Sequence, residues 1–241
     1  MTLTKKLILI TGASRRIGRA MALRLAHEGA AVIIHHGHSS VDAEKILAEV
    51  NAFGGEAYII QGDLDDPSQP AKIIEAAFSI GPLFALVNNA SIFEPLSWDK
   101  TDLNAWNRHL AVNLTAPFLL SQSFAKTISP STNGRIVNIL DWRVFRPPAD
   151  HFPYTISKSA LAALTRSLAI ALAPNIQVNG IALGAILPPS VGDTPPNILN
   201  NIPAQRWADL AEVEDTLLFL LDGPGYITGE IIHVDGGRHL I

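Results

Sequence analysis

The sequence predicts a single α/β domain over residues 1–241, built as a doubly wound, seven-stranded, mostly parallel sheet with helices on both faces. Three observations support this. A chain of 241 residues fits one large domain better than two small ones. Short, nearly continuous runs of Val, Ile, Leu and Ala indicate parallel strands that are buried on both faces. Longer amphipathic or Ala-rich segments separate these runs, so strands and helices alternate along the chain.

The expected elements follow one another in a regular order. The apolar runs predict strands at Leu7–Ile10, Ala31–His35, Ala57–Gln61, Ala85–Asn88, Arg135–Leu140, Gln177–Ile181 and Ile231–Val234. The segments between them predict helices at Ile17–Glu28, Val41–Phe53, Gln69–Phe78, Asp102–Thr127, Tyr154–Leu172 and Ala211–Leu221. The stretch from residue 187 to about 208 is rich in Pro and Asn and predicts a long irregular loop. Loops of that length inside a domain are usually functional, so we expect this one to cover a substrate.

The composition excludes several classes of protein. Hydrophobic residues are 48% of the chain and charged residues 17%, which favours a sizeable core over disorder. A net charge of −4 gives no reason to expect a nucleic-acid partner. The chain has no Cys, so disulfides and thiolate chemistry are excluded. The apolar run Leu7–Ile10 is too short for a signal peptide and no segment approaches a membrane span, so we expect a cytoplasmic protein that does not contact membranes.

A glycine-rich turn, Thr11–Gly18, follows the first predicted strand and opens a helix. Backbone N–H groups and the helix N-terminus face a pyrophosphate in a turn of this kind. The residues expected to bind a dinucleotide here are Gly12, Ser14, Arg15, Arg16, Ile17 and Gly18.

The end of the second predicted strand bears on the choice between NAD(H) and NADP(H). NAD-selective folds usually place Asp or Glu there to accept a hydrogen bond from the ribose 2′-hydroxyl. This chain instead has His35, His36, His38 and Ser39, with no carboxylate in the segment. Arg15, the hydroxyls and partly protonated His side chains are suited to a 2′-phosphate, so NADP(H) is favoured. A metal site is not expected, because neighbours on an extended segment point in opposite directions.

Two further segments are expected to bind the cofactor. Asp63 and Leu64 follow the third strand, and Asn89, Ala90 and Ser91 follow the fourth. Open α/β sheets bind ligands at the carboxyl ends of their strands, which is where both segments lie. The carboxylate of Asp63 is expected to accept a hydrogen bond from the adenine amino group.

Candidate catalytic residues lie in the middle of the chain. Tyr154 and Lys158 are four residues apart and share one face of the predicted helix. An ammonium beside a phenol favours the phenolate, so we expect Tyr154 to be a good proton donor near neutral pH. Asp141 ends the apolar run before this helix. Pro117 has no N–H, so the carbonyl of Asn113 loses its helical partner and can hold a water that leads to Lys158.

These motifs together resemble the short-chain dehydrogenase/reductase family, from Lys5 to about Gly237. The resemblance implies that Tyr154 supplies the proton and that Lys158 lowers the pKa of Tyr154 and holds the nicotinamide ribose. It implies that Asn113 anchors a proton relay and that Gly184 and Ile186 approach the nicotinamide. It also implies a homo-oligomer, a dimer or tetramer, assembled through the helix that starts at Tyr154 and the long helix before it.

Three departures from the usual family pattern, together with Phe93, make the chain resemble the pteridine reductase and dihydromonapterin reductase branch. Arg16 and Ser91 stand where Gly is usual, Asp141 stands where Ser is usual, and Phe93 follows the Asn-Asn-Ala-Ser turn. The resemblance implies that Arg16 reaches both the cofactor phosphate and the substrate, and that Phe93 stacks on a flat heterocycle. The expected substrate-binding residues are Arg16, Ser91, Phe93, Asp141 and Tyr154.

Asp141 decides the expected substrate on physical grounds. The Ser of a carbonyl reductase hydrogen-bonds the substrate oxygen as that oxygen becomes an alkoxide, whereas an ionised carboxylate repels it. A carboxylate suits a cationic or N–H-rich group, so we expect NADPH-dependent reduction of a C=N bond in a pterin or dihydrofolate. Two alternatives stay open: a carbonyl or 3-oxoacyl reductase of the same family, and a non-catalytic NADP(H)-sensing protein. The presence of Tyr154 and Lys158 argues against the second.

Overall fold

A computed structural model describes residues 3–129, 132–188 and 198–241. In this part of the chain, one parallel sheet has the strand order β3-β2-β1-β4-β5-β6-β7. The strands are β1 (Leu7–Ile10), β2 (Ala31–His36), β3 (Glu56–Gln61), β4 (Leu83–Asn88), β5 (Gly134–Asp141), β6 (Ile176–Leu183) and β7 (Ile231–Val234). The order reverses between β1 and β4, which confirms the predicted doubly wound sheet and makes its centre the expected place for a ligand.

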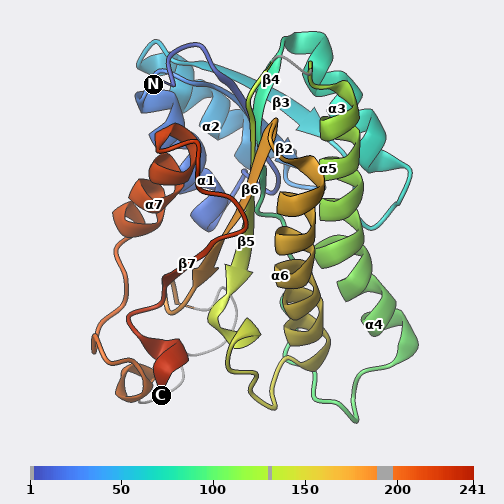
Figure 1. Ribbon diagram of the computed structural model, residues 1–241, viewed down its shortest axis with the longest axis vertical. Coiled ribbons are helices and arrows are strands. Elements are labelled where there is room, and N and C mark those ends of the chain that lie inside the picture. The colour runs from blue at the N-terminus through green and yellow to red at the C-terminus, as the bar shows by residue number, and fades with distance from the viewer. Residues whose placement is uncertain (1–2, 130–131, 189–197) are drawn as a thin grey trace.

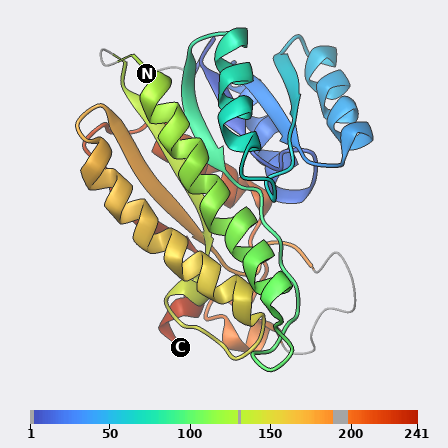
Figure 2. The same cartoon turned by 90° about the vertical axis from the view of Figure 1, so that its right-hand side faces the viewer.

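Helices cover both faces of this sheet (Figures 1 and 2). On one side lie α1 (Arg16–His27), α2 (Ser40–Ala52) and α7 (Leu210–Asp222). On the other side lie α3 (Gln69–Ile80), α4 (Leu103–Leu110), α5 (Ala116–Thr127) and α6 (Phe152–Leu172). Short 3-10 helices are η2 (Trp142–Val144), η3 (Ile198–Asn201) and η4 (Arg238–Leu240). The predicted loop at about 187–208 therefore contains η3, and its residues 189–197 lie outside the described part.

The strand β1 shows why the apolar runs are continuous rather than alternating. Ile8 and Ile10 pack into the cluster formed with α1, α2 and α7, whereas Leu7 and Leu9 pack into the cluster formed with α3, α5 and α6. All four side chains are buried. Burial of each is worth about 1.5–3 kcal/mol, so both faces of the strand stabilise the fold. Helices on both faces therefore require apolar residues at every position of the strand.

The predicted long helix Asp102–Thr127 is interrupted in its middle. After α4 the chain forms a π-helical turn, η1 (Ala111–Thr115), before α5 begins. The N–H of Ala116 donates to the carbonyl of Ala111, five residues back. Pro117 has no N–H to donate to the carbonyl of Asn113, so the regular four-residue ladder cannot continue there. Turns of this type are frequent at functional sites, and Asn113 lies inside it, fully buried.

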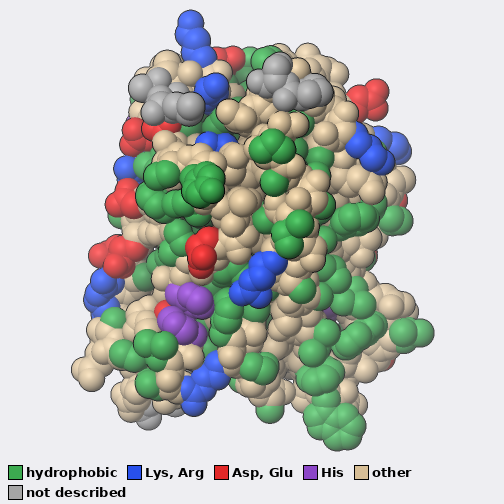
Figure 3. All heavy atoms as spheres, in the orientation of Figure 1, with side chains coloured by type: hydrophobic (Ala, Val, Ile, Leu, Met, Phe, Trp, Pro, Cys, Tyr) green, Lys and Arg blue, Asp and Glu red, His purple; other side chains and the backbone are tan. Residues whose placement is uncertain are grey.

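Charges of both signs are dispersed over one face of the molecule (Figure 3). On the face shown in Figure 3, Lys and Arg side chains alternate with Asp and Glu and do not gather into one basic patch. Among the described residues, no helix has the length and apolar character that a membrane crossing demands.

Candidate active site

A cavity of about 580 Å³ lies at the carboxyl ends of the central strands, where the strand order reverses. It brings together most of the residues predicted to bind a cofactor: Gly12, Ser14, Arg15, Arg16, Ile17, Gly18, His35, His36, His38, Ser39, Asp63, Leu64, Asn89, Ala90 and Ser91. Sequence reasoning missed six other lining residues: Gly37, Gly62, Asp65, Ile92, Arg108 and Val112. Gly62 directly follows a predicted strand and Gly37 lies between His36 and His38, which was a usable signal. Arg108 and Val112 come from α4 and the π-turn, where no motif marked them.

Two glycines of the turn after β1 leave room that no other residue would leave. Gly12 has φ +62°, and a Cβ there would lie 2.9 Å from the Cα of Ala90. A Cβ on Gly18 would strike the carbonyl of Gly12 and lie 2.6 Å from the side-chain nitrogen of Asn89. The hydroxyl of Thr11 accepts from the N–H groups of Asn89 and Ala90, both at 3.0 Å, and so fixes the two turns together. This narrow cradle of backbone fits the pyrophosphate of a dinucleotide.

Arg16 stands in the turn in a conformation that usually favours glycine. Its φ is +52°, which costs an L-residue about 1–2 kcal/mol and explains why Gly is usual there. The guanidinium of Arg16 donates to the carbonyl of Pro188 at 2.6 Å. Arg16 thus lines the cavity and also holds the start of the predicted substrate loop.

His35 forms the floor of the cavity as a neutral side chain. Its Nδ1 accepts from the N–H of Gly12 at 3.2 Å, which leaves Nε2 to donate to the carbonyl of Gly62 at 3.0 Å. Burial lowers the pKa of His35 from 6.5 to about 4. The expectation that a partly protonated His35 binds a phosphate is therefore wrong, because its burial disfavours the charge and both ring nitrogens are already engaged.

The cationic groups expected at the 2′-phosphate have carboxylate partners in this structure. Arg15 pairs with Asp42 at 2.5 Å, and Nε2 of His38 lies 3.3 Å from the carboxylate of Asp63. The segment after β2 has no carboxylate of its own, but the fold brings these two to it. A phosphate bound here competes with Asp42 for Arg15. Among the described residues, no group of three or more His, Cys, Asp or Glu side chains is arranged to hold a metal ion.

Asp141 and Tyr154 are in direct contact. The phenol of Tyr154 donates to Oδ2 of Asp141 at 3.0 Å, and Oδ1 of Asp141 accepts from the backbone N–H of Arg143 at 2.9 Å. Burial raises the pKa of Tyr154 well above its ordinary value of 10, and the charge of Asp141 raises it further. The expected lowering of this pKa is thus not found: in this structure Tyr154 keeps its proton at neutral pH and holds it against a carboxylate.

Lys158 lies one helical turn after Tyr154 and is buried. Its ammonium donates to the carbonyl of Ile139 in β5 at 2.7 Å and lies 5.9 Å from the centre of the Tyr154 ring. Burial lowers the pKa of Lys158 to about 8, against the opposing effect of Asp141. Lys158 is therefore a charged group at neutral pH that loses its charge in mildly alkaline solution.

The side chain of Asn113 joins the cavity to the catalytic helix. Its Oδ1 accepts from the hydroxyl of Ser91 at 3.0 Å and from the N–H of Ile92 at 2.9 Å. Its Nδ2 donates to the carbonyl of Ile92 and to the hydroxyl of Ser157, both at 3.0 Å. Asn113, in the π-turn, therefore fixes the cavity wall at Ser91 and Ile92 to Ser157, which lies one turn after Tyr154 in α6. The sequence did not predict this role of the Asn113 side chain.

Phe93 borders the catalytic phenol. Its ring is half exposed and meets Tyr154 edge to face, with 4.6 Å between the ring centres. His151 stacks on Phe93 at 3.9 Å and covers part of its surface. Sequence reasoning placed Phe93 beside the reacting groups but missed His151.

Gly184 and Ile186 do not line the cavity. The N–H of Gly184 donates to the carbonyl of Val234, and a Cβ on Gly184 would lie 2.6 Å from the Cα of Asp235. Ile186 is buried in the core. In this structure Gly184 is needed for the close approach of two backbone segments.

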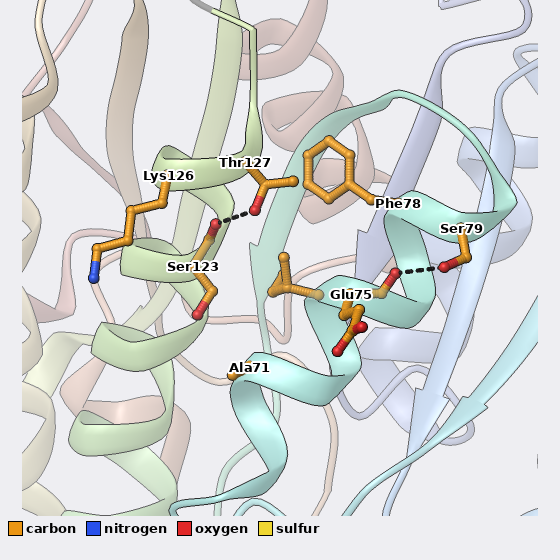
Figure 4. A pocket seen from close by; sticks show the side chains of 8 residues that line it. Ala71, Glu75, Phe78, Ser79, Ser123, Lys126 and Thr127 are labelled. Atoms are coloured by element: carbon orange, nitrogen blue, oxygen red, sulfur yellow. Dashed lines mark hydrogen bonds between the residues drawn. The ribbon is translucent and has the colours of Figure 1, made fainter.

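A second hollow, of about 450 Å³, lies between α3 and α5 (Figure 4). The hydroxyls of Ser79 and Thr127 in its wall donate to the carbonyls of Glu75 and Ser123 in their own helices, each at 2.9 Å. These two hydroxyls are thus used within their own helices.

The cradle after β1 and the Asp-Tyr-Lys cluster define an oxidoreductase that uses a nicotinamide dinucleotide. A protein-family model, that of the short chain dehydrogenases, matches residues 6–197 of this chain. The chain belongs to the short-chain dehydrogenase/reductase family, as its motifs predicted.

Solved structures and curated relatives agree with this assignment over nearly the whole chain. FolM alternative dihydrofolate reductase 1 from Brucella canis, complexed with NADP, is 37% identical, with a TM-score of 0.92 over 100% of this chain and 97% of that chain. A blue fluorescent protein from a metagenomic library, in complex with NADPH, is 32% identical, with a TM-score of 0.91 over 99% of each chain. A 3-oxoacyl-[acyl-carrier-protein] reductase from Synechocystis sp. is 33% identical over 98% of this chain and 97% of its own length.

Proposed function

We propose that this protein is an NADPH-dependent reductase that acts on a C=N bond of a pterin or a dihydrofolate. One observation carries the proposal: the carboxylate of Asp141 accepts the hydrogen bond of the Tyr154 phenol at 3.0 Å. The likeness to a FolM alternative dihydrofolate reductase supports it. The likeness to a 3-oxoacyl reductase favours the second candidate, a carbonyl or 3-oxoacyl reductase.

The charge of Asp141 separates the two candidates energetically. For a reacting atom about 4 Å from the carboxylate and an effective dielectric constant of about 20, a unit charge interacts by about 4 kcal/mol. A ketone oxygen that becomes an alkoxide meets this as a penalty, equivalent to about a thousandfold in rate. A ring nitrogen that takes up a proton gains a stabilisation of the same size. The site therefore favours a basic nitrogen over a carbonyl oxygen.

The chain's own groups supply the proton and orient the substrate. Bound NADPH supplies a hydride to the ring carbon. The phenol of Tyr154 gives its proton to the neighbouring ring nitrogen, so that C=N becomes CH–NH. Lys158 is charged below a pKa of about 8 and offsets the negative charge left on Tyr154. Phe93 presents its exposed surface to the flat ring, and Asp141 accepts from ring N–H donors.

The cofactor role of the cavity is part of this proposal. The backbone around Gly12 and Gly18 holds the pyrophosphate, and Asn89 holds the turn in shape. Arg15 and the exposed His38 bind the 2′-phosphate of NADP(H) after release from their carboxylate partners.

The test measures NADPH oxidation with dihydrobiopterin, dihydrofolate, a simple ketone and a 3-oxoacyl thioester. Wild type is expected to reduce a heterocycle, and Asp141→Ser to lose that activity and gain ketone reduction. Asp99→Ser, an exposed carboxylate far along the chain from Asp141, is the control and should change neither.

Three results contradict the proposal in different ways. Better turnover of the ketone or the thioester by wild type identifies the second candidate. An unchanged substrate preference in Asp141→Ser removes the role given to this carboxylate. Tight NADPH binding without oxidation across the whole panel identifies a non-catalytic NADP(H)-sensing protein.

A further inference from the structure

Asp141 has a second neighbour, Arg143, which its role in proton transfer does not explain. The backbone N–H of Arg143 donates to Oδ1 of Asp141 at 2.9 Å, and Nη1 of the same residue lies 3.5 Å from that oxygen. Both side chains are only 13% exposed. One residue thus approaches a single carboxylate oxygen with both its backbone and its side chain, while Tyr154 takes the other oxygen.

Aromatic rings hold the guanidinium of Arg143 in place. Its central carbon lies 5.3 Å from the ring centre of Phe93 and 5.1 Å from that of Trp142. Its Nη2 lies 3.5 Å from the carboxylate of Asp150, whereas its buried Nε has no hydrogen-bond partner among the described residues. Two aromatic rings therefore help to fix the fork beside Asp141.

The other groups that face Asp141 show whether any of them could replace Arg143. Tyr154 and Lys158 face Asp141 from α6, His151 interacts with it from the N-terminus of that helix, and Arg238 interacts with it from η4. Tyr154 is neutral, the ammonium of Lys158 bonds to Ile139, and burial lowers the pKa of His151. Arg238 packs on Trp142 at 4.1 Å. Among the described residues, Arg143 is the cation in direct contact with the carboxylate itself.

We propose that Arg143 is a positioning residue that holds the carboxylate of Asp141 turned toward Tyr154. The fork and the backbone N–H fix one carboxylate oxygen, so that the other faces the phenol. This inference rests on the proposed function, because it gives Arg143 a role through the carboxylate that selects nitrogen heterocycles. Arg143 itself need not touch the substrate.

A rival explanation is that Arg143 acts through Phe93, which it also contacts. The two differ in their dependence on Asp141. If Arg143 works through the carboxylate, its loss costs little once that carboxylate is gone. If it works through the ring of Phe93, the loss is the same with or without the carboxylate.

The experiment is a double-mutant cycle on the full-length protein, read as kcat/KM for the heterocycle that wild type reduces best. Arg143→Met is expected to lower kcat/KM about tenfold, and Arg143→Lys, which keeps the charge, to restore part of the loss. In the Asp141→Asn background, Arg143→Met is expected to lower kcat/KM less than about twofold. Arg146→Met removes an exposed Arg from the same segment and should have no effect.

A second readout needs no turnover. The hydrogen bond from Tyr154 to Asp141 is followed with NADPH bound through the ring resonance of Tyr154, which is assigned by its loss in Tyr154→Phe. In Arg143→Met this resonance is expected to move toward its position in Asp141→Asn, and in Arg146→Met to stay in place. An unmoved resonance, or equal losses of kcat/KM in both backgrounds, overturns the inference. Failure of wild type to reduce any heterocycle overturns the proposed function alone, since the resonance still tests Arg143.

Discussion

Replacement of His35 by Gln tests how the cavity floor is built. The folded protein disfavours a proton on His35, because burial lowers its pKa from 6.5 to about 4. The unfolded chain takes that proton up freely. Stability from the neutral imidazole is thus fully present above pH 6.5 and is lost as the pH falls toward 4. The whole difference is worth about 3 kcal/mol.

The measurement is the free energy of unfolding in urea at several pH values. Near pH 5 nearly one proton separates the unfolded from the folded state at this site, so His35 contributes a slope of about 1.2 kcal/mol per pH unit. His35→Gln keeps a donor and an acceptor but cannot titrate, and should lose that slope. His38→Gln removes a side chain that is 79% exposed and should keep it. An equal slope in wild type and His35→Gln between pH 6.5 and pH 4 would refute the reasoning.

Three further predictions concern binding and assembly. Gly12→Ala should weaken NADPH binding, measured by fluorescence titration, and should destabilise the fold more than Gly54→Ala does. Both glycines have positive φ, but only a Cβ at Gly12 would meet other atoms. Equal effects of the two substitutions would contradict this reasoning. Phe93→Ala should raise KM for the heterocycle about tenfold and leave NADPH affinity unchanged, whereas Phe145→Ala should change neither. Light scattering should give the mass of a dimer or tetramer. Ile170→Glu, on the exposed side of α6, should weaken this assembly, whereas Val41→Glu, on α2, should leave it unchanged. A monomeric mass at micromolar concentration would refute assembly.

The sheet and most of the cofactor cavity could be predicted from the sequence, because local patterns determine them. Apolar runs such as Leu7–Ile10 identify buried strands, and the glycine-rich turn directly follows one. Because the strands run parallel, the turns that follow them lie at one edge of the sheet. Gly12 and Asn89 therefore meet although they are far apart in the sequence.

What the sequence did not reveal are contacts that depend on exact distances between elements. The pairing of Arg15 with Asp42 and the neutral state of His35 follow from how α2 and the strand ends approach the turn. Helix spacing shows that Lys158 shares a face with Tyr154, but it does not show that burial and Asp141 outweigh the ammonium and raise the pKa of Tyr154. Ser157, in the helix expected to form the oligomer interface, is buried and bonded to Asn113.

The π-turn at Ala111–Thr115 makes this helix intolerant of a change in its length. Removal of one residue there would rotate everything before it by about 100° relative to α5 and shift it along the axis by about 1.5 Å. Asn113 would then point away from Ile92 and Ser157, whose bonds it now completes. Single-residue deletions scanned along α4 and α5 should therefore be worst tolerated at this turn, even where the residue removed has no chemistry of its own.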